Sequence, residues 1–254
     1  MNMDFEKILS VAITIGEKML CSGAEVGRVE DTVARICRAY NAKEINVFTI
    51  TSLMTVTAEF EGKTYTQTRR VSAYDNTNFE LLDRLNALSR EICANKPEPE
   101  EITKRLDKLL SLKPYRLWVQ VLAWSAIAGA FTIFFGGCFT DFFVSAVVGA
   151  LLKLSQLFVG KMGINKVFSN VICSYIMCSL AYLSVKLGLG VSADNIIIGN
   201  VMLLIPGIAL TNSVRDLISR DIAAGALRLL DAALVSIAIA GGYALTLLTF
   251  GGAL

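Results

Sequence analysis

The spacing of apolar residues divides the chain into two parts. Up to about residue 112, apolar residues recur at the intervals of amphipathic helices, with β-branched residues concentrated in the middle. From Leu117 onward, hydrophobic stretches of about 20 residues follow one another, each long enough to cross about 30 Å of hydrocarbon. The pattern predicts an α+β domain over residues 1–112 and a helical, polytopic transmembrane domain over residues 113–254.

In the first part, apolar residues recur with the spacing of helices in some stretches and of strands in others. The expected elements are helices at residues 4–22, 26–40, 78–94 and 100–112, and strands at residues 45–50, 53–60 and 64–71. The stretch GAEVGRVE between the first two helices does not have the spacing of a dinucleotide-binding loop, so a helix–helix turn is expected there rather than a phosphate site. The carboxylates of Glu25, Glu30 and Asp31 are expected to be solvated charges on a helix face.

Five membrane spans are expected in the second part, at residues 117–138, 142–160, 168–187, 196–214 and 223–250. Pro206 and Gly207 interrupt the fourth, because proline removes a backbone donor and glycine leaves helical angles without penalty. In a bilayer such a break is tolerated where protein or a water-filled cavity satisfies the freed backbone groups. Interrupted membrane helices are typical of the substrate sites of transporters.

Basic residues favour one side of the expected spans. Lys113 and Arg116 precede the first span, Lys161 and Lys166 follow the second, and Arg215 follows the fourth. Because cytoplasmic loops are enriched in Lys and Arg, the N-terminal domain is expected in the cytoplasm and the C-terminus outside.

Polar side chains cluster after the break and at the start of the last span. Asn200 and Thr211 would offer donors and acceptors, and Arg215 or Arg228 would meet a substrate carboxylate. An acidic side chain there would meet an ammonium group or carry a coupling proton. The candidate substrate-binding residues are Lys153, Asn200, Pro206, Gly207, Thr211, Asn212, Arg215, Asp216, Asp221, Arg228 and Asp231.

Simpler roles stay open for these residues. Residues 212–221 would also suit a solvated cytoplasmic turn, and Arg228 would pair with Asp231 three residues on or extend toward the headgroups. A charge near mid-bilayer costs at least ~2.5 kcal/mol. Lys153, flanked by leucines, is therefore expected to face the bundle interior or water, with Asp216, Asp221 or Asp231 as its partner.

Composition narrows the function classes. The net charge is +2 and the charges of the first part are balanced, which gives no basis for binding nucleic acid. Histidine is absent and the six cysteines have no metal-ligand spacing, so no metal, cofactor or enzyme centre is expected. The GxxxxGK[ST] motif is also absent, which argues against ATP hydrolysis and favours a secondary transporter.

The stretch PGIALTNSVRDLISRDIAAGALRLLDAAL, residues 206–234, resembles the membrane signature of the threonine/serine exporter family. SGAEVGRVE at residues 22–30 and TQTRR at residues 66–70 resemble the cytoplasmic domain of that family. The resemblance implies a multi-pass protein of the inner membrane that exports threonine and serine, driven by the proton gradient, or succinate-like dicarboxylates in split members.

The chain departs from the family pattern in two places. Residue 220 is Arg where Gly is common, and the sequence stops at Leu254, where long members continue with more membrane helices. The chain therefore resembles the split form of the family, and its expected partner is a second small polytopic membrane subunit or another copy of itself. The alternative function is a non-transporting membrane sensor or assembly subunit.

Overall fold

The computed structural model describes residues 5–71, 77–111 and 114–250. The chain forms two compact units. One consists of Met1–Lys113 with Ile208–Leu230, and the other of Pro114–Gly207 with Asp231–Leu254. The predicted domain boundary between residues 112 and 113 lies outside the described residues.

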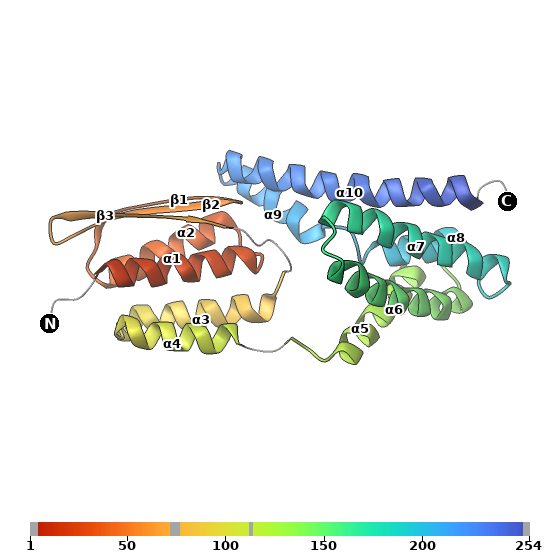
Figure 1. Ribbon diagram of the computed structural model, residues 1–254, viewed down its shortest axis with the longest axis horizontal. Helices are drawn as coiled ribbons and strands as arrows, with labels where there is room; N and C mark the ends of the chain where they lie inside the picture. Colours follow the sequence, from red (N-terminus) through yellow and green to blue (C-terminus); the bar gives the residue numbers. More distant parts are fainter. Residues whose placement is uncertain (1–4, 72–76, 112–113, 251–254) are drawn as a thin grey trace. The chain divides into compact units, whose positions relative to one another are not determined.

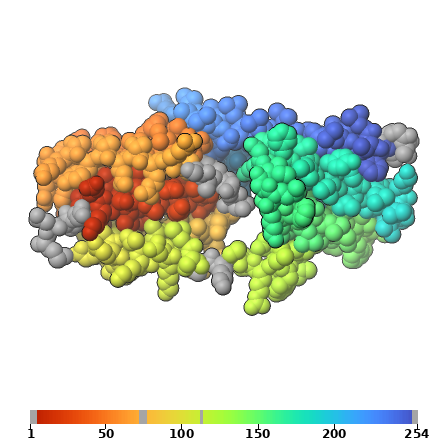
Figure 2. All heavy atoms as spheres, in the orientation of Figure 1, coloured from red at the N-terminus to blue at the C-terminus, as the bar shows by residue number. Residues whose placement is uncertain are grey.

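The N-terminal residues of the first unit form three layers (Figures 1 and 2). The elements are α1 (Phe5–Cys21), α2 (Val26–Ala39), β1 (Lys43–Ile50), β2 (Leu53–Phe60), β3 (Lys63–Arg70), α3 (Phe79–Asn95) and α4 (Pro99–Leu110). The antiparallel sheet, with β2 between β1 and β3, covers one side of α1 and α2, and α3 and α4 cover the other. These elements lie where the apolar spacing predicts them.

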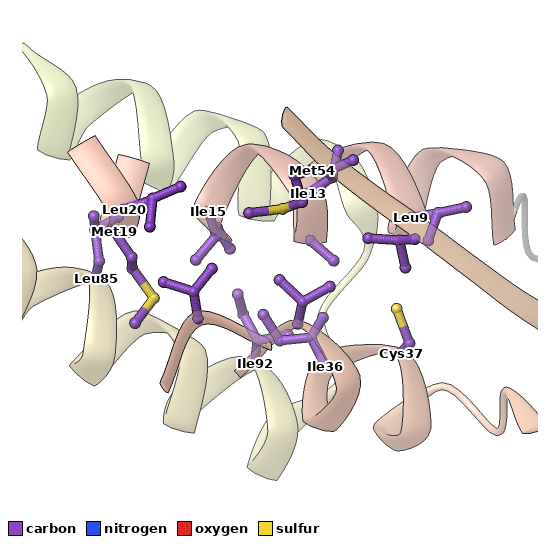
Figure 3. Packing of buried hydrophobic residues seen from close by; sticks show 14 of the residues in the cluster. Leu9, Ile13, Ile15, Met19, Leu20, Ile36, Cys37, Met54, Leu85 and Ile92 are labelled. Atoms are coloured by element: carbon purple, nitrogen blue, oxygen red, sulfur yellow. The ribbon is translucent and has the colours of Figure 1, made fainter. Parts of the chain in front are cut away.

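The core of this unit follows from the alternation of its strands. Met54, Val56 and Ala58 of β2 are fully buried against the helices, while Thr55 and Thr57 lie on the opposite face. Figure 3 shows side chains of α1, α2 and α3 converging with Met54 on one interior. Burying a Leu, Ile or Met side chain is worth about 1.5–3 kcal/mol, so this interior is the main stabilising feature of the unit.

The same core extends to a helical hairpin from the second part of the sequence. We call residues 208–230, from α9 (Gly207–Ile218) and the start of α10 (Ile222–Phe250), the α9–α10 hairpin. Ala224 in this hairpin is 2% exposed and belongs to the hydrophobic core of the first unit. Arg220 turns the chain with a φ of 71°, a left-handed angle that costs a non-glycine residue about 1–2 kcal/mol. Glycine would adopt this φ without strain, which fits the glycine expected at this position from the family resemblance.

The second unit is helical. It contains α5 (Leu117–Phe134), α6 (Phe139–Lys161), α7 (Lys166–Lys186), α8 (Ala193–Val201) and the remainder of α10. Helix α5 packs on α6 and α8, and α6 on α7 and α8. Ser174 of α7 donates to the carbonyl of Ile239 of α10 at 2.7 Å. The residues that pack between these helices form a second hydrophobic core.

The predicted count of five spans is not confirmed. Among the described residues, four helices are long and apolar enough to cross a membrane, namely α5, α6, α7 and α10. The fourth expected span is instead two short helices, α8 and α9, separated by residues 202–206. Helix α8 has nine residues and is about 13 Å long, so it cannot cross the hydrocarbon alone. The interruption expected at Pro206 and Gly207 is present, and it divides the expected span.

Helix α8 approaches α5 closely because of one glycine. A Cβ on Gly199 would lie 2.0 Å from Thr132 Oγ1 and 2.9 Å from the Ala128 carbonyl oxygen. The backbone of α5 supplies one of these atoms and cannot move as a side chain does. Close packing of this kind is how small residues bring membrane helices together.

We therefore expect Gly199→Ala to destabilise the second unit by about 1–3 kcal/mol, as overpacking does. The measurement is the thermal unfolding midpoint of the detergent-solubilised chain. Gly160→Ala in α6 is the matched control, because a Cβ there meets no atom within 4 Å. Equal midpoints for the two variants would contradict the close approach of α8 and α5.

Candidate functional site

The candidate site begins at the turn between α1 and α2, residues 22–26. Gly23 has a φ of 98°, the left-handed angle that ends many helices, and the Ala24 N–H donates to the Met19 carbonyl. Glu25 precedes α2 with an extended backbone and makes no side-chain cap bond. The turn therefore leaves the Gly23 and Ala24 carbonyls and the first N–H of α2, that of Val26, to bind groups from another part of the chain. It is the helix–helix turn that the sequence predicts at this place.

Residues of the α9–α10 hairpin bind consecutive groups of this turn. Asn212 Nδ2 donates to the Gly23 carbonyl at 2.9 Å, and Arg228 Nη2 donates to the Ala24 carbonyl at 3.3 Å. The Val26 N–H donates to Asp216 Oδ1 at 3.2 Å. Each of these hydrogen bonds joins residues about 190 or more positions apart in the sequence. The polar residues of the signature stretch thus hold the hairpin to the N-terminal layers of its own unit.

Asp216 and Arg228 also form a buried ion pair. Arg228 Nη1 lies 3.2 Å from Asp216 Oδ2, and the two side chains are 5% and 2% exposed. The Asp216 carboxylate lies at the N-terminus of α2, where the helix dipole favours negative charge. Burial raises the pKa of the Asp216 carboxyl, and Arg228 and the Val26 N–H act against this rise. Removing one partner of such a pair typically costs about 3–5 kcal/mol, since the other charge stays buried.

A second ion pair lies at the edge of the cluster. Arg215 Nε lies 2.7 Å from Glu25 Oε2, with the arginine side chain 61% exposed and the glutamate 17% exposed. Because the arginine is largely in solvent, this pair contributes about 0–1 kcal/mol at most. It adds charge complementarity to the contact rather than much stability.

Arg228 and Asp231, three residues apart on α10, do not lie in equivalent surroundings. Arg228 is 4% exposed and reaches Asp216 and the Ala24 carbonyl, whereas Asp231 is exposed. From Asp231 to Phe250, α10 has about 20 residues and is about 30 Å long, which is sufficient to cross a bilayer. Arg228 therefore has a buried acidic partner within the first unit.

Other predicted site residues lie in the second unit. Asn200 of α8 is fully buried, and its Nδ2 donates to Ser145 Oγ at 2.8 Å and to the Ile196 carbonyl at 2.9 Å. Thr132 Oγ1 lies 2.6 Å from the same Ser145 oxygen, which completes a polar cluster between α5, α6 and α8. Interhelical hydrogen bonds of this kind hold membrane helices together. The same groups would also be suited to lining a solute pathway.

Lys153 has an aromatic neighbour. Its ammonium group lies 4.8 Å from the centre of the Trp124 ring, a cation–π contact between α6 and α5. Of its three expected partners, Asp216 is paired with Arg228 instead. The half-buried position of Lys153 fits the expectation that its charge avoids lipid.

The remaining predicted residues lie around the break and the hairpin turn. Pro206 is half-buried at the end of the break, Gly207 begins α9, and Thr211 is exposed on α9. Asp221 immediately precedes α10, where an acidic residue is favourable. Its Oδ2 lies 4.0 Å from the position of a Cβ on Gly27, so Asp221 lies beside the first turn of α2. On an unbroken helix Asn200, Thr211 and Arg215 would share one face, but residues 202–206 separate α8 from α9.

Two acidic residues at the start of α2, Glu25 just before it and Glu30 within it, have more specific roles than the sequence predicted. Glu25 pairs with Arg215 and Arg28, and Glu30 Oε1 accepts a hydrogen bond from the Thr49 N–H of β1 at 2.7 Å. Only Asp31 is the exposed helix-face charge that was expected for all three.

The chain is similar to known exporters over nearly its whole length. The family model described as "Putative threonine/serine exporter" matches residues 10–250. The "Threonine/serine exporter" of Corynebacterium glutamicum is 27% identical over 82% of this chain and 44% of its own length. The "Probable threonine/serine exporter" of Mycobacterium tuberculosis is 21% identical over 95% of this chain and 46% of its own length.

The chain thus spans less than half the length of these curated relatives. No solved structure matches it significantly. The match to the family model covers both the N-terminal layers and the membrane helices, including the interrupted helix and the hairpin with its buried ion pair. The chain belongs to the threonine/serine exporter family.

Proposed function

We propose that this chain is part of a secondary transporter that exports small amino acids, threonine and serine, across the cytoplasmic membrane. The proton gradient is the proposed driving force. The N-terminal layers lie in the cytoplasm in this proposal, and the C-terminal end of α10 reaches the outer side. The chain spans less than half the length of its curated relatives, and a second small polytopic membrane subunit or another copy of the chain is its proposed partner in the transporter.

The observation that carries the proposal is the interrupted helix at residues 202–206 in a chain of this family. The chain turns at this break through short-range hydrogen bonds, such as those from the Leu203 N–H to the Asn200 carbonyl and from the Leu204 N–H to the Val201 carbonyl. Discontinuous helices of this kind are typical of transporter substrate sites. The break follows Asn200, which belongs to the polar cluster with Ser145 and Thr132. The break and this polar cluster support a polar pathway through the second unit.

Lys153, Thr211 and Asp231 are the proposed charged or polar groups of the pathway. An amino acid carries one carboxylate and one ammonium group, which a cation and an anion on the protein would bind. Asp231 is exposed and lies beyond the buried ion pair, so it is the carboxylate we assign to substrate ammonium or to a coupling proton. The further proposed substrate-binding residues are Asn212, Arg215, Asp216, Arg228, Pro206, Gly207 and Asp221.

Two alternatives are distinguished by the same assay. Export of succinate-like dicarboxylates would use the cations of the pathway in the same way. A non-transporting sensor or assembly subunit is favoured by one observation, namely that the signature charges bind the turn at residues 22–26. Such a subunit would bind a ligand without moving it across the membrane.

The test is uptake of labelled threonine into inside-out vesicles with an acidic lumen. Vesicles contain the full chain, with and without a polypeptide carrying the other half of a threonine/serine exporter. Asp231→Asn is expected to lower the initial rate at least about tenfold, the effect of about 1.4 kcal/mol. The matched control is Asp194→Asn, an exposed carboxylate in the first turn of α8, which is expected to leave the rate unchanged.

Uptake of succinate but not of threonine would show that the substrates are dicarboxylates rather than small amino acids. Threonine binding without uptake under every condition would favour the sensor or assembly subunit. Equal rates for Asp231→Asn and the wild type would remove Asp231 from the pathway.

A further inference from the structure

The contact between the α9–α10 hairpin and the turn at residues 22–26 brings many charges together. On the side of α2 lie Glu25, Arg28 and Glu30, and β1 contributes the Thr49 N–H. The hairpin contributes Arg215, Asp216, Asp221 and Arg228. Arg215 and Arg28 both contact Glu25, and Arg228 contacts Asp216.

Among the acidic residues of this cluster, Glu30 is held by β1. Its Oε1 accepts the Thr49 N–H at 2.7 Å, and its side chain is half-buried. Glu30 lies one helical turn after Val26 and Gly27, the residues beside Asp216 and Asp221. Like charges that approach in a region shielded from water make it unfavourable for all of them to be ionised.

The protonation of Glu30 reflects these surroundings. The pKa of Glu30 is raised from 4.5 to about 7, mainly by burial and further by the charges of Asp221 and Asp216, while the Thr49 hydrogen bond acts against the rise. Two of the groups that raise the pKa belong to the hairpin. If the hairpin moved away from α2, the charges of Asp216 and Asp221 would no longer raise the pKa of Glu30.

We propose that the α9–α10 hairpin and the turn at residues 22–26 form a reversible latch, closed by Asn212, Asp216 and Arg228, whose closure is linked to binding of a proton by Glu30. In the closed latch Glu30 holds the proton beside Asp216 and Asp221. In the open latch the carboxyl is solvated and releases it. Since α10 continues into the second unit, the latch gives the membrane helices a connection to cytoplasmic pH.

The direction of the pH dependence follows from linkage. The closed latch raises the pKa of Glu30 above its ordinary value of 4.5 toward about 7. Protonation therefore favours closure, which is strongest below the ordinary value and weakens as the pH rises through about 7. Between about pH 6 and about pH 8.5 the closing equilibrium falls by up to about tenfold, if the open latch restores the ordinary value.

The measurement is hydrogen–deuterium exchange of the full chain in lipid nanodiscs, read at peptides containing the Val26 amide, which donates to Asp216 only in the closed latch. Protection factors, which remove the intrinsic pH dependence of exchange, are compared over this pH range. The wild type is expected to lose up to about tenfold protection with rising pH. Glu30→Gln, which is neutral at every pH, is expected to keep its protection throughout.

Two further variants complete the design. Asp31→Asn, at the exposed neighbouring carboxylate, is the matched control and is expected to follow the wild type. Asn212→Ala removes the bond to the Gly23 carbonyl without leaving a buried charge, and is expected to lower protection at all pH values. Protection of Val26 that does not change with pH in the wild type, or an unchanged pH profile in Glu30→Gln, would overturn the proposal. Threonine flux is not part of this readout, so its result is independent of the proposed export.

Discussion

The contact between the α9–α10 hairpin and α2 depends on the high cost of burying a charge without a partner. Arg228 lies in an apolar stretch of sequence and Asp216 in a polar one, and the two side chains meet each other and the backbone of the turn at residues 22–26. This satisfies their charges with protein groups rather than with lipid headgroups. The contact joins the signature stretch, residues 206–234, to the SGAEVGRVE stretch, residues 22–30. The two stretches are the two sides of one contact.

The contact gives the interrupted helix a structural setting. Helix α8 ends at Val201, and α9 begins a new helix at Gly207 whose polar face binds α2. An interruption is tolerated where other groups satisfy the freed backbone. Within the first unit, the hairpin is held by hydrogen bonds, by the ion pair and by the burial of Ala224 in the hydrophobic core. These interactions make the hairpin a defined element rather than a solvated turn.

Periodicity in the sequence was sufficient for most of the fold. Alternation in β2 and helical spacing in α1 to α4 identify elements whose buried faces depend on local order, and Pro206 identifies the interruption. Periodicity did not predict which residues far apart in the sequence contact each other. Nothing local distinguishes Asp231 from Asp216 as the partner of Arg228, because that choice depends on where Val26 lies, about 190 residues earlier. The count of five spans is not confirmed for a related reason, since hydropathy alone does not reveal that residues 202–206 separate two short helices.

Cross-linking in intact membranes tests the central claim most directly, namely that the α9–α10 hairpin binds the start of α2. Cysteines at positions 27 and 221, introduced as Gly27→Cys and Asp221→Cys in a chain whose native cysteines are replaced by alanine, are expected to form a disulfide on mild oxidation. The distance of 4.0 Å between Asp221 Oδ2 and a Cβ on Gly27 supports this expectation. The pair Thr55→Cys and Thr68→Cys, whose hydroxyls lie 3.2 Å apart in the sheet, reports that the oxidation works. Cross-linking of the sheet pair without any cross-linking between positions 27 and 221 would contradict the account.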